Sequence, residues 1–255
     1  MSSVHHTSAA PTPHGRVPST KLVSDVDAIR EVVESILEDF EKAPTTYTIA
    51  VDLEGANIGP KTGKLAIVTV AVPNGDVLLL DVATHGDEAF TKGGIKILLE
   101  HPHLPKLWFD IRTDTSALFP HGVKPAHIVD LQVGMMCHMA VGARRKPDYL
   151  SGLGKAMTMY NLPADMTLKE RGLNMFAPER GGTYQVFFDR PMSDTMMQYC
   201  AADVYHLFSM HKQLKRYTEK MIQVADERIT RFYNNTLPER SQRLRDMMVK
   251  VDFPL

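Results

Sequence analysis

Asp203 is a carboxylate on the apolar face of a predicted helix, and among the residues that could do chemistry it most needs a partner. A helical stripe runs through residues 193–215 and contains Met196, Cys200, Leu207, Met210 and Leu214. An ionised, unpaired carboxylate on such a face would cost several kcal/mol, so Asp203 requires a cation, a set of donors or a proton. Tyr199 lies one turn earlier on the same side. Arg190, just before the helix, is a candidate partner for an ordinary buried ion pair.

A pair of acids lies on a predicted strand. Residues 46–54 (TYTIAVDLE) are rich in β-branched and aromatic residues. Because side chains alternate along a strand, Asp52 and Glu54 share one face, with their Cβ atoms about 7 Å apart. The ordinary alternative is a solvent-exposed face at a strand end, since acids two positions apart are common.

Two further aspartates follow short predicted strands. Asp114 in KLWFDIRTDTSAL would begin a helix, and an aspartate there is explained equally well as an N-cap. Asp130 in HIVDLQ is interpreted as a strand-end or capping residue.

The segments that carry these residues alternate between predicted strands and predicted helices. A helical period over residues 29–40 predicts an amphipathic helix that starts at Ser24 or Asp25. The Asn74–Gly75 turn predicts that neighbouring strands form an antiparallel meander. We therefore expect an α/β fold with a mixed β-sheet flanked by helices. The remaining elements are strands at 65–72, 76–82, 106–109 and 128–131, a helix ending near residue 100 and a helical stretch after residue 114.

Composition indicates a folded protein of a reducing compartment. Of 255 residues, 44% are hydrophobic and 23% are charged, which is typical of a globular domain. Apolar runs such as Leu65–Val68 are far shorter than the ~18 residues of a membrane helix, and the first residues do not have a signal-peptide pattern, so we expect no such peptide. Two cysteines cannot form a disulfide framework. We expect an intracellular protein of the nucleus or cytoplasm that does not bind membranes.

The net charge of −1 conceals an asymmetry. Residues 211–255 contain ten basic and six acidic residues, so this segment carries +4 and residues 1–210 carry −5. We expect three regions: a flexible leader (1–22), a folded domain (23–215) and a basic helical extension (216–255). The basic side chains either contact phosphates or form a solvated face; they are Lys212, Lys215, Arg216, Arg228, Arg231, Arg240, Arg243 and Arg245.

The order of these acidic motifs resembles the DEDDy group of 3′-5′ exonucleases, the ribonuclease D-like branch. The motifs are Asp-x-Glu on the first strand, an aspartate after a Lys-x-Trp-Phe strand, and Tyr-x-x-x-Asp within RPMSDTMMQYCAADVYHL. The flanking stretches GKLAIVTVAV, HIVDLQVGMM and DYLSGLGKAM also resemble family segments. The match covers roughly residues 28–214 and is closest in style to the Egalitarian-like and exonuclease-domain-containing proteins. The resemblance implies that the α/β fold is a ribonuclease H-like mixed β-sheet flanked by helices and that residues 23–215 are a 3′-5′ exonuclease domain.

The resemblance implies a catalytic site with two divalent ions, Mg²⁺ or Mn²⁺, about 3.5 to 4 Å apart. It implies that Asp52 bridges both ions, that Glu54 and Asp203 complete the site that activates water, and that Asp114 helps to hold the second ion. Tyr199 would orient the attacking water rather than deprotonate it, because a phenol with a pKa of ~10 is a poor base at pH 7. A change of register would exchange Asp114 for Asp110, but the flanking residues favour Asp114.

The resemblance implies release of nucleoside 5′-monophosphates from the 3′ ends of RNA or single-stranded DNA. The alternative is a catalytically weak or silent RNA-binding adaptor with the same fold, which the Egalitarian-like resemblance keeps open. Retention of all four carboxylates and the tyrosine favours the enzyme. His206 follows Asp203 and is interpreted as a helix residue rather than a ligand. A protein partner would supply targeting if the chain has one.

Overall fold

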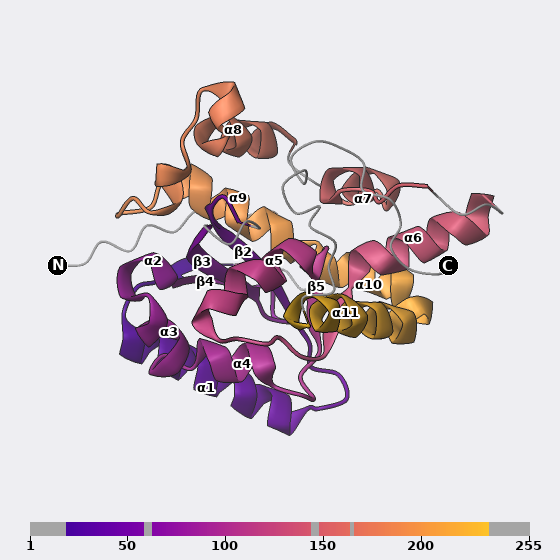
Figure 1. Ribbon diagram of the computed structural model, residues 1–255, viewed down its shortest axis with the longest axis horizontal. Helices are drawn as coiled ribbons and strands as arrows, with labels where there is room; N and C mark the ends of the chain where they lie inside the picture. The colour runs from indigo at the N-terminus through magenta and orange to yellow at the C-terminus, as the bar shows by residue number, and fades with distance from the viewer. Residues whose placement is uncertain (1–18, 59–62, 144–147, 164–165, 235–255) are drawn as a thin grey trace.

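The computed structural model describes residues 19–58, 63–143, 148–163 and 166–234 (Figure 1). Their centre is a six-stranded mixed sheet with the order β1-β4-β3-β2-β5-β6. Strands β2, β3 and β4 are antiparallel neighbours, whereas β1 runs parallel to β4, and β5 and β6 continue the sheet in parallel from β2. The strands are β1 (Thr20–Val23), β2 (Ile49–Ala56), β3 (Lys64–Ala71), β4 (Val77–Asp81), β5 (Lys106–Trp108) and β6 (Ile128–Asp130).

Helices occupy both faces of this sheet. The α-helices are α1 (Val26–Lys42), α2 (Val82–His85), α3 (Asp87–Thr91), α4 (Ile95–Glu100), α5 (Ile111–Leu118), α6 (Leu131–Ala143), α7 (Leu153–Met159), α8 (Met166–Phe176), α9 (Asp194–Tyr205), α10 (Leu207–Leu214) and α11 (Thr218–Tyr233). The 3₁₀ turns of the described residues are η1 (Phe119–His121), η2 (Pro178–Arg180), η3 (Tyr184–Phe187) and η4 (Lys215–Tyr217). The predicted mixed sheet flanked by helices is confirmed. No helix within the described residues has both the length and the apolarity needed to cross a bilayer.

The predicted antiparallel meander is also confirmed. Strand β3 pairs with β2 on one side and with β4 on the other. The tight turn between β3 and β4 contains Gly75 at a φ of 95°, a conformation that glycine adopts without steric cost.

Strand β1 corrects the expected extent of the leader. The expected flexible segment includes residues 20–22, but Thr20 to Val23 pair in parallel with Val77 to Leu80. Ser19 supports this edge, since its backbone N–H and its hydroxyl both donate to the Asp76 carboxylate. The short segment lacks a strong apolar alternation because it is an edge strand with one neighbour. Residues 1–18 lie outside the described part of the chain.

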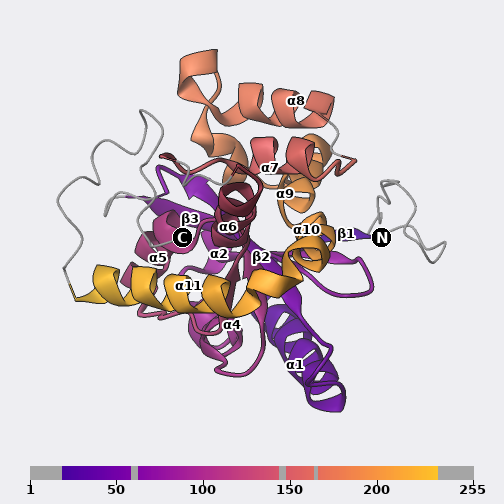
Figure 2. The same cartoon turned by 90° about the vertical axis from the view of Figure 1, so that its right-hand side faces the viewer.

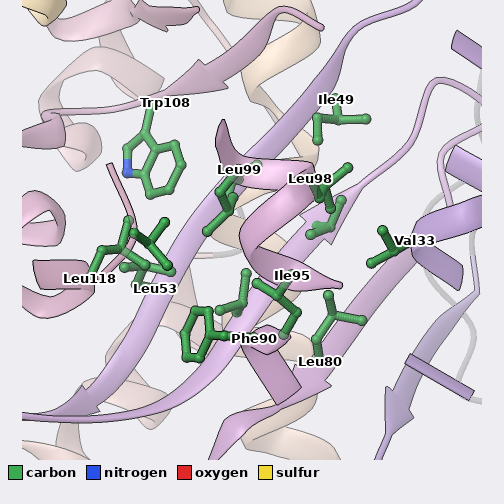
Figure 3. Close-up of a cluster of buried hydrophobic side chains, with 14 of the residues drawn as sticks. Val33, Ile49, Leu53, Leu80, Phe90, Ile95, Leu98, Leu99, Trp108 and Leu118 are labelled. Carbon is green, nitrogen blue, oxygen red and sulfur yellow. The ribbon is translucent and has the colours of Figure 1, made fainter. Parts of the chain in front are cut away.

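The alternation of β2 separates two hydrophobic clusters. Val51 and Leu53 point toward the face that α1, α3 and α4 cover, and Figure 3 shows Leu53 among the side chains of this cluster. Ala50 points to the opposite face, toward α9 and α10. By the same alternation, Asp52 and Glu54 lie on that second face, so both carboxylates point toward α9.

Helix α1 is the predicted amphipathic helix. Its N-cap is Asp25, whose carboxylate accepts hydrogen bonds from the backbone N–H groups of Asp27 and Ala28. Its buried stripe covers the sheet opposite the acidic residues and comprises Ile29, Val33, Ile36 and Phe40.

Helix α11 belongs to the folded domain rather than to a separate extension. It packs against β6, α5 and α6 and buries Met221, Val224 and Ile229. Arg228 is only 3% exposed, so the interpretation of this residue as a phosphate contact is wrong. Lys212, Lys215, Arg216 and Arg231 are exposed, whereas Arg240, Arg243 and Arg245 lie outside the described residues.

Lys106 on β5 should make stability depend on pH. Its buried ammonium donates to the backbone oxygens of His101 and Leu104, and burial lowers its pKa to about 7. The unfolded chain keeps the ordinary value of 10.5, so it binds more protons between pH ~7 and ~10.5. The contribution of Lys106 to the free energy of unfolding therefore rises with pH, by up to ~1.4 kcal/mol per unit.

We expect the difference in unfolding free energy between the wild type and Lys106→Met to change steadily between pH 7 and 9, in favour of the wild type as the pH rises. Urea denaturation at several pH values measures this difference. Parallel stability curves for the two proteins would contradict the assignment.

Candidate active site

Three carboxylates from β2 and α9 meet on the second face of the sheet. One oxygen each of Asp52, Glu54 and Asp203 lies within 4.8 Å of the others. Asp203 is 8% exposed, and the two strand residues are partly buried. Helix α9 begins at the Ser193 cap, whose hydroxyl accepts from the Met196 N–H, and it packs on β2. The helical stripe and the strand alternation together therefore bring the three acids to one point.

The proximity of these acids raises their pKa values. Burial, and then the charge of Asp203, raise the pKa of Asp52 to about 7. Burial raises the pKa of Glu54 well above its usual range, and the charges of Asp52, Asp203 and Asp114 add to this. The pKa of Asp203 is raised by burial, although Lys169 and Tyr199 act in the opposite direction. A cation between the three would relieve this repulsion.

Asp114 lies beside this cluster on α5. Its carboxylate accepts a hydrogen bond from the indole N–H of Trp108. Burial and the charge of Asp52 raise its pKa well above the usual range. Asp114 is thus close enough to interact with Asp52 and Glu54, although it falls outside the 4.8 Å group. Helix α5 begins at Ile111, so Asp114 lies inside its first turn and the N-cap alternative is wrong.

Asp110 is engaged elsewhere. Its carboxylate accepts hydrogen bonds from Arg112 Nε at 2.6 Å and Arg112 Nη2 at 2.5 Å, and from the Gln132 side chain at 3.1 Å. Although burial opposes them, these partners and Arg228 hold the pKa of Asp110 below its usual value. Asp110 also has a φ of 69°, so it forms the bend between β5 and α5. This arrangement leaves Asp114 as the acid of this segment that faces the cluster.

Asp130 fixes that bend, which extends the capping role expected of it. From the end of β6 it accepts hydrogen bonds from the N–H groups of Asp110 and Ile111. The buried Arg228 guanidinium pairs with it at 2.7 Å. Asp130 thereby connects α11 to the start of α5 and to the position of Asp114.

Lys169 is a site residue that the sequence did not reveal. It extends from α8, which lies over α9 (Figure 2), and its ammonium forms an ion pair with Asp203 Oδ1. Arg190, the expected candidate, pairs instead with Asp81 at 2.5 Å. No local pattern marked Lys169, because its partner lies 34 residues away.

Tyr199 stands one turn before Asp203, as the spacing predicted. Burial and the charges of Asp203, Glu54 and Asp52 raise its pKa far above the ordinary value of 10. Its ring lies 5.4 Å from that of Phe176 and 5.7 Å from the Lys169 ammonium, measured to the ring centroids. Tyr199 therefore keeps its proton at neutral pH beside the carboxylates.

Residues 26–219 match the model of the family described as 3′-5′ exonuclease. This chain belongs to that family. The exonuclease domain is similar in structure to ribonuclease D of Trypanosoma brucei in complex with RNA U12, with a TM-score of 0.65 and 23% identity over 83% of this chain and 70% of that one. It is also similar to ribonuclease D of Escherichia coli, with a TM-score of 0.60 and 16% identity over 84% of this chain and 50% of that one.

These comparisons confirm the ribonuclease D-like fold predicted from the motifs. The exonuclease domain spans 63% of a further T. brucei structure, ribonuclease D in complex with GMP, which it matches with a TM-score of 0.62 and 23% identity over 80% of its own length. No curated protein sequence matches this chain.

The donor set of the exonuclease domain fits a divalent metal ion. Carboxylate oxygens are the ligands that Mg²⁺ and Mn²⁺ prefer, and Asp52, Glu54 and Asp203 offer three within a span of 4.8 Å. His206 lies outside this group. It is buried at the junction of α9 and α10, and burial lowers its pKa.

Gly172 in α8 allows Tyr199 to pack closely against that helix. A Cβ atom at position 172 would lie 2.2 Å from Cδ2 of the Tyr199 ring. We expect Gly172→Ala to displace the ring or helix α8, to lower the free energy of unfolding by about 1 to 3 kcal/mol and to reduce activity.

Gly154 in α7 provides the matched control, because a Cβ atom there meets nothing within 4 Å. Gly154→Ala should be neutral or stabilise by up to ~1 kcal/mol. Thermal denaturation and activity assays of both variants test this. Equal behaviour of the two would show that the packing of Tyr199 on α8 is unimportant.

Proposed function

We propose that this chain is a metal-dependent 3′-5′ exonuclease that releases nucleoside 5′-monophosphates from RNA or single-stranded DNA. The observation that carries this proposal is the convergence of Asp52, Glu54 and Asp203, with Asp114 and Tyr199 beside them, in a domain of the 3′-5′ exonuclease family. Asp114 and Asp203 are buried, and Asp52 and Glu54 are partly buried. Four such carboxylates side by side would destabilise the fold without a bound cation, which supports a role in binding one.

Asp52, Glu54, Asp114 and Asp203 would hold two divalent ions, Mg²⁺ or Mn²⁺. Such ions, when bound, acidify water and offset the negative charge that develops on a phosphodiester during displacement. In the overall reaction, water oxygen bonds to the terminal phosphorus, the bond from phosphorus to the 3′ oxygen breaks, and that oxygen takes up a proton. The products are a nucleoside 5′-monophosphate and a strand shortened by one residue.

Tyr199 acts in this proposal by positioning. Its raised pKa keeps the phenol protonated, so it does not serve as the general base. The hydroxyl donates its one proton to Asp203, so Tyr199 would position that carboxylate and the attacking water beside it. Tyr199→Phe should therefore reduce activity less than loss of a carboxylate.

A groove beyond the carboxylates supports a nucleic-acid substrate. It encloses about 440 Å³ at the end of β2, two residues past Glu54, and is lined by Ala56, Lys64, Thr183, Tyr184, Gln185 and Phe188. Aromatic rings stack on unpaired bases and lysine neutralises phosphates, so this lining suits a single strand. The similar T. brucei ribonuclease D forms a complex with RNA U12.

A labelled oligonucleotide assay tests the proposal. The full chain is incubated with 5′-labelled single-stranded RNA or DNA and Mg²⁺ or Mn²⁺, with an excess of chelator as the control. We expect a ladder of products, each one nucleotide shorter, together with nucleoside 5′-monophosphate, and no reaction on a strand whose 3′ end is blocked. Binding of RNA without any metal-dependent shortening would overturn the enzyme and favour the adaptor.

A further inference from the structure

We propose that Lys169 is an internal counter-cation that competes with divalent metal ions for Asp203 and thereby sets the metal affinity of the site. The inference rests on the proposed function, because it assumes that the carboxylate cluster binds metal. It assigns to Lys169 a positioning role rather than a catalytic one.

The contact itself is well shielded from solvent. Lys169 Nζ pairs with Asp203 Oδ1, and the two side chains are 17% and 10% exposed. An ion pair that excludes water is screened far less than one on the surface, so its charge strongly affects any third charge nearby. Helix α8 supplies the lysine from outside the sheet, and α8 packs directly on α9.

The competition follows from charge and from the shared carboxylate. Asp203 belongs to a group of three carboxylates whose oxygens lie within 4.8 Å, and the Lys169 ammonium already contacts that residue. A divalent ion bound to the group would lie close to the ammonium and repel it. Metal binding therefore requires the ammonium to withdraw. Lysine can do so, since its charge is carried on a flexible four-carbon chain.

Two effects of opposite sign should result from removing this charge. In chelator, Lys169→Met leaves the carboxylates without their cation, so its melting temperature should fall below that of the wild type. In metal titrations the same variant should bind Mn²⁺ more tightly, by about fivefold or more, because the competing charge is gone. A residue with only a structural role would lower stability without tightening metal binding.

Calorimetric titration of the full chain with MnCl₂ tests the inference, with melting temperatures recorded in chelator and in saturating Mn²⁺. The variants are Lys169→Met, Lys169→Gln and the charge-retaining Lys169→Arg, and the control is Lys155→Met at an exposed position of α7. We expect tighter Mn²⁺ binding by the Met and Gln variants and a larger increase in their melting temperature on metal addition. The Lys169→Arg variant and the control should stay near the wild-type values.

The outcomes separate the two proposals. Wild-type binding of Mn²⁺ with equal or weaker binding by both Lys169→Met and Lys169→Gln would overturn the competition and leave the proposed metal site intact. Failure of every variant and of the wild type to bind Mn²⁺ would overturn both. If Lys169→Met does not fold, Lys169→Gln carries the comparison, because its amide retains hydrogen bonding to Asp203 without the charge.

Discussion

Asp52→Asn should abolish nucleotide release while making the protein more stable in the absence of metal. Asp52 lies within the 4.8 Å group with Glu54 and Asp203, and its loss removes one of the carboxylates that would hold the ions. Metal ions contribute several kcal/mol to such reactions, so we expect at least a ~1000-fold fall in rate, equivalent to about 4 kcal/mol. Asp203→Asn should cause a comparable loss.

The gain in stability follows from the sign of the pKa shift. The pKa of Asp52 is about 7 in the folded protein, against an ordinary value of 3.8. The native state therefore binds more protons than the unfolded chain between pH ~4 and ~7, and its stability falls as the pH rises through this window. The amide introduced by Asp52→Asn carries no charge to bury, so at pH 8 in chelator the variant should gain on the order of 1 to 4 kcal/mol.

Urea denaturation in chelator and the oligonucleotide assay in Mn²⁺ together check this prediction. Asp194→Asn, at an exposed position in the first turn of α9, is the matched control and should change neither quantity appreciably. A destabilised, inactive Asp52→Asn protein would show that Asp52 has a structural role. Full activity of the Asp52→Asn variant would show that Asp52 is not a catalytic residue.

Arg228→Met should destabilise the fold by about 3 to 5 kcal/mol, the usual cost of removing one partner of a buried ion pair. The Arg228 guanidinium is buried and pairs with Asp130 at 2.7 Å. Without it Asp130 remains a buried charge, although it still accepts from the N–H groups of Asp110 and Ile111. Because these bonds fix the start of α5, the variant should also misplace Asp114 and lose activity.

Two comparisons test whether the loss of stability in Arg228→Met comes from the buried ion pair: one with a variant of an exposed arginine, and one with a double variant. Arg30→Met in α1 removes only surface pairs with Asp27 and Glu34, so it should cost less than ~1 kcal/mol. Combining Arg228→Met with Asp130→Asn removes both charges and should recover part of the lost stability. Urea denaturation of the wild type and these variants, with Asp130→Asn alone, measures these differences. Additive losses in the double variant would mean that the ion pair is not the cause.

The sequence by itself determined the features that depend on neighbouring residues. The alternation of β2 placed Asp52 and Glu54 on one face, and the helical period of α9 placed Tyr199 and Asp203 on the buried side. The Asn74–Gly75 turn specified the meander. Such features follow from the fixed geometry of strands, helices and turns, so a few adjacent residues suffice to predict them.

Only the tertiary structure decided which distant charges meet. Lys169 reaches Asp203 across 34 positions, and Arg228 reaches Asp130 across 98, and no local pattern distinguishes either cation from a surface residue. The same holds for Asp110 and Asp114: their spacing allowed either to face the site, and the contacts that Asp110 makes with Arg112 and Gln132 favour Asp114. An ion pair depends on where whole elements pack, and that position is a property of the complete fold rather than of the segment that contains either partner.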